Sequence, residues 1–231
     1  MSENLGLSSA ITGVVVNYRT PELLDRAVRS FHEAYPDIRV LIVDNGSEDE
    51  SIDVIDRLET DYTGVVDSLR LSENLYHGPA MDRAIQRLET PYVYLFDSDT
   101  LTRTSGFLER MIEELESRTN AYGAGRVLTV NSRGFASEDG TRILWAPYML
   151  IDRAIYRELP PFEHHGVPVL RNMEAAEERG YELVEFPVEE YVEHLGRGTA
   201  SKYGYGLGLR SRLNNLLHRL GLDRLLERVG L

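Results

Sequence analysis

Short apolar runs alternate with amphipathic helical patterns over residues 11–100, and this alternation restricts the fold more than any other feature. We expect four strands here, at residues 11–16, 40–43, 65–71 and 92–96. The first run is continuously apolar, which is typical of a parallel strand buried on both faces. Repeated β-α-β units with short connections predict an α/β fold, with a mostly parallel sheet flanked by helices.

Signals for the start of a helix follow three of these predicted strands. Thr20 and Pro21 supply an N-cap and a first-turn proline. Ser47 and Glu50 have the spacing of a capping box, so a helix is expected to begin at Ser47. Pro79 is expected to open the next helix.

Polar side chains come directly after the predicted strands. These residues are Asn17, Asp44, Asn74 and Asp97. In open α/β sheets, ligands bind beyond the carboxyl ends of the strands. We therefore expect a ligand site that is lined by these four side chains.

The second half of the chain is less regular. Further elements are expected as strands at residues 123–130, 143–150 and 182–188, a helix at 170–179 and a loop at 162–168. The length of 231 residues suits one large domain, to which we assign residues 1–208. Residues 209–231 are predicted to form a C-terminal amphipathic helical tail, with leucines at helical spacing and arginines on the remaining surface.

The composition excludes several classes of function. The chain has no cysteine, which excludes disulfides, thiolate metal sites and cysteine nucleophiles. Its formal net charge of -13 at pH 7 repels nucleic acid, so no nucleic-acid partner is expected. Apolar runs stay well below the ~20 residues of a membrane-spanning helix, and the N-terminus lacks the pattern of a secretory signal. A cytoplasmic location is therefore expected.

Asp97-Ser98-Asp99 is the motif with the clearest chemical meaning. Two carboxylates at a strand end can face one cavity, and hard divalent cations commonly bridge such carboxylates to substrate phosphates. A metal ion there would neutralise a departing nucleoside diphosphate, which this acidic chain cannot easily do by itself. The alternative is a polar turn in which Ser98, Asp99 or Thr100 caps the next helix.

Four segments together resemble the inverting GT-A glycosyltransferases of family 2. They are residues 14–18, 43–47, 74–85 and 96–99, and their order and spacing match from about residue 11 to 105, and more loosely to about 200. The resemblance implies a single GT-A-like, Rossmann-like domain. It also implies a sugar transferase that uses a nucleotide-sugar donor.

The resemblance assigns roles to the residues at the strand ends. Asn17 and Tyr18 would line the base pocket, and Asp44 would hydrogen-bond the nucleobase, commonly uracil. Asp97 would hold the ribose or the metal. Asp99 would ligate the metal, Mn²⁺ or Mg²⁺, on the diphosphate.

The segment that begins at Asn74 would complete the donor site. Gly78 lets the backbone turn tightly there, and His77 either reaches the sugar or lies on the surface, which we favour. The family usually has an asparagine where this chain has Asp82. We expect Asp82 to pair with an arginine of its own helix.

His194 is the second candidate metal ligand. The family often has a histidine at this place that completes the metal site, and imidazole suits manganese better than calcium. The alternative is an ordinary half-buried histidine.

The catalytic base is where this chain departs from the family. Inverting transfer needs a group that deprotonates the acceptor hydroxyl, and the family takes it from a Glu-Asp pair that is missing here. Glu163 and His164 are the candidates, with His165 beside them, whereas Glu174 is expected to face solvent. Alternatively, the enzyme is retaining and needs no base at this place.

The sequence thus predicts metal-dependent transfer of a hexose-type sugar from a UDP- or GDP-linked donor to a hydroxyl. The acceptor, whether glycan, lipid-linked or small molecule, is left open. One alternative is a nucleotidyltransferase, but residues 17–21 do not form the glycine-rich basic loop of that class. Another is a catalytically inactive sugar-nucleotide-binding protein, which the missing Glu-Asp pair favours.

Two interpretations of the tail also stay open. Its apolar face packs on this domain or on a second copy to form a homodimer, which is the interpretation we favour. Alternatively, it rests on the inner face of the membrane as a peripheral anchor, where arginine meets anionic headgroups.

Overall fold

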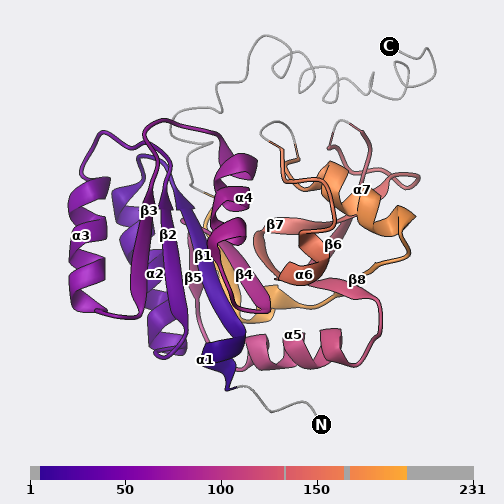
Figure 1. Ribbon diagram of the computed structural model, residues 1–231, viewed down its shortest axis with the longest axis horizontal. Coiled ribbons are helices and arrows are strands. Elements are labelled where there is room, and N and C mark those ends of the chain that lie inside the picture. Colours follow the sequence, from indigo (N-terminus) through magenta and orange to yellow (C-terminus); the bar gives the residue numbers. More distant parts are fainter. Residues whose placement is uncertain (1–5, 133, 164–166, 197–231) are drawn as a thin grey trace. The chain divides into compact units, whose positions relative to one another are not determined.

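The computed structural model describes residues 6–132, 134–163 and 167–196 (Figure 1). Seven strands form the central sheet: β1 (Ile11–Asn17), β2 (Arg39–Asp44), β3 (Val66–Arg70), β4 (Tyr92–Asp97), β6 (Ala121–Val130), β7 (Thr141–Asp152) and β8 (Glu182–Glu185). Their order is β3-β2-β1-β4-β7-β6-β8. Only β7 runs against its neighbours in this sheet, so the predicted mostly parallel α/β architecture is confirmed.

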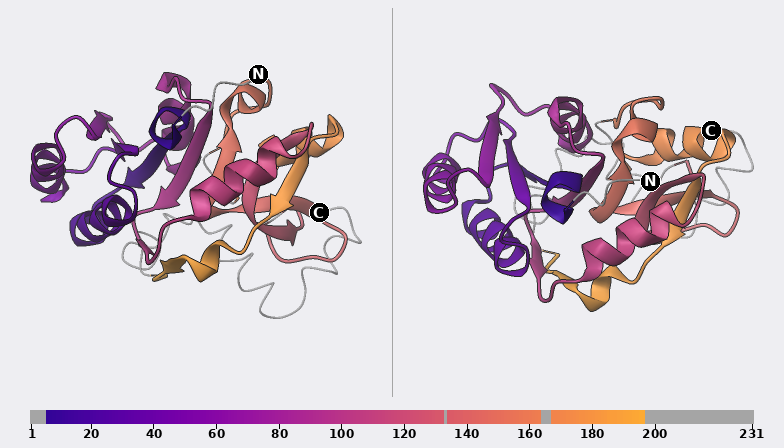
Figure 2. Two further views of the ribbon diagram at one scale, coloured as in Figure 1. Left: turned by 90° about the horizontal axis from the view of Figure 1, so that it is seen from below. Right: turned by 60° about the horizontal axis from the view of Figure 1, so that its bottom comes forward.

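Helices cover both faces of this sheet (Figure 2). The described helices are α1 (Leu7–Ala10), α2 (Pro21–Ala34), α3 (Ser51–Asp61), α4 (His77–Arg87), α5 (Phe107–Glu116), α6 (Arg153–Tyr156), α7 (Leu170–Glu178) and the 3-10 helix η1 (Val188–Glu190). Side chains of α2, α3 and α5 pack in one buried cluster, and those of α4 and α7 in the other. Alternate residues of β1 and β4 enter the two clusters, as the pleat of a strand requires. None of the described helices is both long and apolar enough to cross a membrane.

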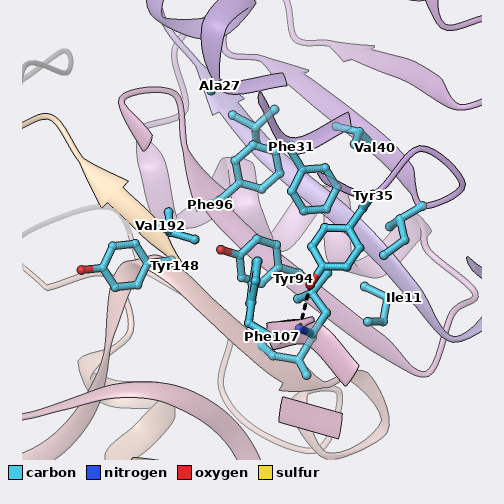
Figure 3. Packing of buried hydrophobic residues seen from close by; sticks show 14 of the residues in the cluster. Ile11, Ala27, Phe31, Tyr35, Val40, Tyr94, Phe96, Phe107, Tyr148 and Val192 are labelled. Carbon is cyan, nitrogen blue, oxygen red and sulfur yellow. Dashed lines mark hydrogen bonds between the residues drawn. The ribbon is translucent and has the colours of Figure 1, made fainter. Parts of the chain in front are cut away.

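Stacked aromatic rings fill the core beneath α2 and α5 (Figure 3). The ring of Phe31 lies 5.0 Å from that of Phe96, and the ring of Tyr35 meets Phe107 edge-on at 5.3 Å. Gly13 of β1 passes under this stack, where a Cβ atom would lie 3.3 Å from both Phe31 and Phe96. The packing ties β1 and β4 to one rigid layer, and these two strands end at the candidate site.

A second, two-stranded sheet lies beyond the end of β4. Its strands are β5 (Thr100–Thr102) and β9 (Val192–His194), which pair antiparallel with Thr100 opposite His194. No pattern in the sequence predicts this sheet. Residues 98 and 99 do form a turn, but the prediction that one of residues 98–100 caps the next helix is wrong, because β5 follows and α5 begins only at Phe107.

The predicted capping box at Ser47 is also wrong. Helix α3 begins at Ser51, with Glu50 at the N-cap position. The hydroxyl of Ser47 accepts hydrogen bonds from the Arg19 backbone N–H and the Asn17 amide instead. The expected strand at residues 182–188 ends at Glu185 and is followed by η1. The predicted tail, residues 209–231, lies outside the described residues, so the domain boundary after residue 208 remains a prediction.

Candidate active site

A buried network of polar side chains joins the ends of β1, β2 and β4. Asn17 and Asp44 are register partners on adjacent strands, both are fully buried, and the Asn17 amide donates to Asp44 Oδ1 at 3.2 Å. The other Asp44 oxygen accepts from the Ser47 backbone N–H at 3.0 Å. Thr20 Oγ1 donates to Asn17 Oδ1 at 2.9 Å and lies 3.1 Å from Ser98 Oγ, in the acidic motif. Asn17, Asp44 and the acidic motif are therefore parts of one hydrogen-bonded unit.

Asn74 organises the connection between β3 and α4. Its Oδ1 accepts from the Asn45 amide at 3.0 Å and from the Tyr76 backbone N–H at 2.8 Å. Gly46 makes this approach possible, since it has a φ of 75° and a Cβ there would lie 2.6 Å from the backbone of Glu73. Asn74 thus shapes the loop that leads to the candidate donor site.

Strained backbone marks the two loops that border this network. Among the described residues, Arg19 and Tyr76 are the non-glycine residues with positive φ, at 55° and 68°. Such conformations cluster at functional sites. Half-buried Tyr18 precedes Arg19, whose guanidinium lies 5.2 Å from the Tyr18 ring centroid. Tyr18 is therefore beside the network, where the resemblance to family 2 places a base pocket.

Asp97, Asp99 and His194 converge at the end of β4. One ligand atom from each lies within 4.8 Å of the others. The side chains of Asp97 and His194 are 27% and 23% exposed, and that of Asp99 is 7% exposed, so the group opens to solvent on one side. Two carboxylates and one imidazole match the ligand preferences of a divalent transition metal such as Mn²⁺. The three residues predicted as metal ligands are thus brought together and fit such an ion.

The small sheet explains how His194 reaches a motif almost a hundred residues earlier in the chain. Strand β9 pairs with β5, and the Leu195 backbone N–H donates to the Asp99 carbonyl at 2.8 Å. His194 Nε2 then lies 3.3 Å from Asp99 Oδ1. The hydrogen bond with Asp99 raises the pKa of His194 above its ordinary value and outweighs the opposing effect of burial.

His77 is a further member of the site. It lies at the first position of α4, is half-buried, and its Nε2 is 3.3 Å from Asp97 Oδ1. Burial by itself would lower the pKa of His77, but the attraction of Asp97, its hydrogen bond and the charge of Asp99 together raise it. The surface position that the sequence favoured for His77 is therefore wrong. No local sequence signal indicates this contact, because it depends on where α4 lies relative to β4.

The candidate base Glu163 lies against the start of α4. Its backbone packs on Gly78, where a Cβ atom would overlap the Glu163 carbonyl oxygen. The Glu163 side chain is exposed and forms an ion pair with Arg171 at 2.8 Å. The other candidates, His164 and His165, lie outside the described residues. Glu174 is exposed, as expected.

A comparison with known families decides where this chain belongs. The model of the family described as Glycosyl transferase family 2 matches residues 12–178. The chain is a member of glycosyl transferase family 2. The match includes Asn17, Asp44, Asp97 and Asp99, and ends before His194.

Two individual proteins are similar to this family 2 member. A teichoic acid poly(glycerol phosphate) polymerase from Staphylococcus epidermidis is 30% identical over 90 residues, which are 38% of this chain and 12% of the polymerase. The structure of the mannosyltransferase PcManGT from Pyrobaculum calidifontis, in complex with GDP-Man and Mn²⁺, superposes with a TM-score of 0.63 at 16% identity. That match covers 77% of this chain and 55% of the mannosyltransferase, and it confirms the GT-A fold.

The Asp82 side chain departs from the pairing that the sequence predicted. It accepts from the Tyr156 hydroxyl at 2.8 Å and from Gln86 at 3.2 Å, rather than pairing with Arg83 or Arg87. Tyr156 in turn accepts from the backbone N–H of Phe162 at 3.2 Å. In this family 2 member, the carboxylate therefore helps to hold the loop that leads to Glu163.

Proposed function

We propose that the protein transfers a hexose-type sugar from a UDP- or GDP-linked donor to an acceptor hydroxyl, with a divalent metal at Asp97, Asp99 and His194. The convergence of these three side chains within 4.8 Å at the end of β4 is the observation that carries the proposal. Membership of family 2 supports sugar transfer. The GDP-Man and Mn²⁺ bound to the mannosyltransferase of the same fold support a nucleotide-sugar donor and a metal ion.

The metal would be held by the Asp99 carboxylate, the Asp97 carboxylate and the His194 imidazole. When bound, it would supply positive charge to the leaving diphosphate, which is a stabilisation that this acidic protein otherwise lacks. The imidazole favours Mn²⁺, although Mg²⁺ would fit the two carboxylates. Asp99 is the most buried of the three candidate ligands, with 7% of its side chain exposed.

Donor recognition would use the buried network and the half-buried Tyr18 ring. Asn17 and the Ser47 backbone N–H hold the buried Asp44 carboxylate in one orientation, so a nucleobase that reaches it would meet a preoriented acceptor. Asn74 and Gly78 shape the opposite wall of the donor site, where His77 reaches the Asp97 carboxylate. A histidine there would contact the diphosphate or the donor sugar.

Glu163 is the acceptor base in this proposal, with His164 as the alternative. The Glu163 carboxylate would take the proton of the acceptor hydroxyl as the acceptor oxygen attacks the anomeric carbon and the bond from that carbon to the diphosphate breaks. Attack from the face opposite the leaving diphosphate gives inversion. In the structure Glu163 is paired with Arg171. The proposal therefore requires that this exposed ion pair opens when the acceptor binds. Such pairs contribute about 0–1 kcal/mol, so opening it costs little.

The proposed enzyme is cytoplasmic, and its acceptor is a glycan, a lipid-linked molecule or a small molecule. The basic, leucine-rich tail would contact a second copy or the inner face of the membrane. Flotation with anionic liposomes, with and without residues 209–231, separates these two roles of the tail.

Product analysis separates sugar transfer from the alternative functions. The protein is incubated with UDP- and GDP-linked hexoses and Mn²⁺, and the nucleotide products are resolved by chromatography. Release of nucleoside diphosphate that stops in EDTA and in the Asp99→Ala variant supports a glycosyltransferase. Pyrophosphate release from a nucleoside triphosphate with a sugar phosphate would identify a nucleotidyltransferase. Tight donor binding with no product in any reaction would identify an inactive sugar-nucleotide-binding protein.

A further inference from the structure

The pairing between strands β6 and β7 is interrupted by a register shift beside the candidate metal site. Gly125 pairs with Met149 and Val127 pairs with Leu144, so the single residue Arg126 faces residues 145–148 of β7. Irregularities of this kind occur next to active sites, where they redirect a side chain. The side chain at the start of this interruption is Trp145, the only tryptophan in the chain.

Trp145 contacts the candidate metal ligand His194 directly. The two ring centroids are 5.1 Å apart and the planes are almost perpendicular, at 78°. Tyr148, from the same interruption, meets Trp145 at 5.0 Å in a similar edge-on arrangement. Perpendicular pairs of this kind are favoured by the ring quadrupole and fix the orientation of both rings.

A second contact holds the chain segment that leads to His194. The Arg126 guanidinium lies 5.0 Å from the Trp145 ring centroid and forms an ion pair with Glu189 of η1 at 2.9 Å. Helix η1 immediately precedes β9, which carries His194. Arg126 and Trp145 therefore attach both ends of the η1–β9 segment to the large sheet.

The segment needs such support, because the backbone holds it only weakly. Strand β9 makes three residue pairs with β5 and belongs to a two-stranded sheet. Two-stranded sheets are marginally stable by themselves. Mutation of a partner that orients a metal-bound histidine typically weakens metal affinity by about 10–100-fold.

We propose that Trp145 is a positioning residue that holds the His194 imidazole toward Asp99 for metal binding. The inference rests on the proposed metal site, but it concerns a side chain that is not a ligand. Arg126 supports Trp145 from the other side of the interruption. The contact makes metal affinity depend on the packing between β7 and β9.

Mn²⁺ affinity, measured by calorimetry on the full chain without nucleotide, tests the proposal. Trp145→Leu, which removes the aromatic ring, should weaken Mn²⁺ binding about tenfold or more. Trp145→Phe, which retains an aromatic partner for His194, should restore most of the affinity. The matched control is Tyr92→Phe at the opposite end of β4, and it should bind Mn²⁺ as the wild type does. Melting temperatures in EDTA show that each variant is folded.

The fluorescence of Trp145 gives a second readout that does not require any variant of that residue. Paramagnetic Mn²⁺ bound to His194 should quench the single tryptophan, and Asp99→Ala should abolish the quenching. Mn²⁺ that binds equally to Trp145→Leu overturns the inference and leaves the metal site intact. Mn²⁺ that binds to the wild type without quenching is not held by His194, and it overturns both the inference and the proposed metal site. A wild type that binds no Mn²⁺ overturns both the inference and the metal requirement of the proposed function.

Discussion

The backbone of Gly78 packs directly on the backbone of Glu163, with no room between them for a side chain. Gly78 follows His77, which reaches Asp97 at 3.3 Å. The contact therefore attaches the loop that carries the candidate base to the end of α4 that borders the metal site. In the proposed reaction, the donor and acceptor sides of the site would therefore depend on each other at this point.

Gly78→Ala should push the two backbones apart. Overpacking of this kind costs about 1–3 kcal/mol of stability, and a displacement of about 1 Å at a catalytic group can cost about a hundredfold in rate. We expect a lower melting temperature together with a large loss of nucleoside diphosphate release. Gly6→Ala is the control, because no atom lies within 4 Å of a Cβ at Gly6 and its φ is ordinary. Full activity in Gly78→Ala would contradict the close coupling of loop and helix.

Glu163→Gln tests the base, because it preserves the shape of the side chain and removes its capacity to accept a proton. A loss of about a hundredfold or more in transfer, with unchanged donor affinity, is expected of a general base. Arg171→Met is the matched control, since it breaks the same ion pair and leaves the carboxylate. Equal losses in both variants would assign Glu163 to the ion pair alone. Wild-type rates in Glu163→Gln would transfer the role to His164 or His165.

Two tyrosines in the aromatic core should respond in opposite ways to loss of their hydroxyl (Figure 3). The Tyr94 hydroxyl is buried with no hydrogen-bond partner among the described residues. Tyr94→Phe should therefore leave the free energy of unfolding unchanged or raise it by about 1 kcal/mol. The Tyr35 hydroxyl accepts from the Leu108 backbone N–H at 3.1 Å, so Tyr35→Phe should lose about 1–3 kcal/mol. Urea unfolding measures both, and a clear loss in Tyr94→Phe would show that its hydroxyl has a partner.

His32 should make the protein less stable in mild acid. Burial lowers its pKa below the usual 6.5 and outweighs the attraction of Asp37. Above about pH 6.5, His32 is neutral in both the folded and the unfolded chain, and its contribution to stability is fully present. As the pH falls from there toward the folded pKa, His32 binds a proton in the unfolded chain but not in the folded protein, so the free energy of unfolding falls. The difference in unfolding free energy between His32→Phe and the wild type should therefore shift in favour of the variant between about pH 7.5 and 5.5. A difference that does not change with pH would contradict this.

Local patterns in the sequence were enough to predict the large sheet and its strand-end residues. The apolar runs of β1, β2 and β4 are largely buried on both faces. A short run of apolar residues is therefore enough to identify these strands in the sequence. The positions of Asn17, Asp44 and Asp97 in the candidate site could be predicted because each is the last residue of one of these strands. Ser47 shows the limit of such patterns, because its hydroxyl has two tertiary donors, and these outweigh the local capping box.

Contacts between distant segments could not be predicted in the same way. His194 reaches Asp99 through a sheet with three residue pairs, and such a short pairing leaves almost no periodic signal. Trp145 reaches His194 where the pairing of β7 with β6 shifts register opposite Arg126. Such a shift depends on both strands, so the sequence of one strand alone does not predict it. The resemblance to family 2 indicated His194, but it gave no indication of Trp145 or of the His77 contact.

The proposed function requires a metal ion that Asp97 and Asp99 would hold and that would supply positive charge to the nucleotide diphosphate. The most direct measurement is the thermal stabilisation of the wild type and Asp99→Ala by UDP and GDP, in Mn²⁺ and in EDTA. One of these nucleotides should stabilise the wild type in Mn²⁺ by about 3 kcal/mol at a hundredfold excess over its dissociation constant. Neither should stabilise the wild type in EDTA or the variant in Mn²⁺. Equal stabilisation with and without the metal, or in the wild type and Asp99→Ala, would contradict the account.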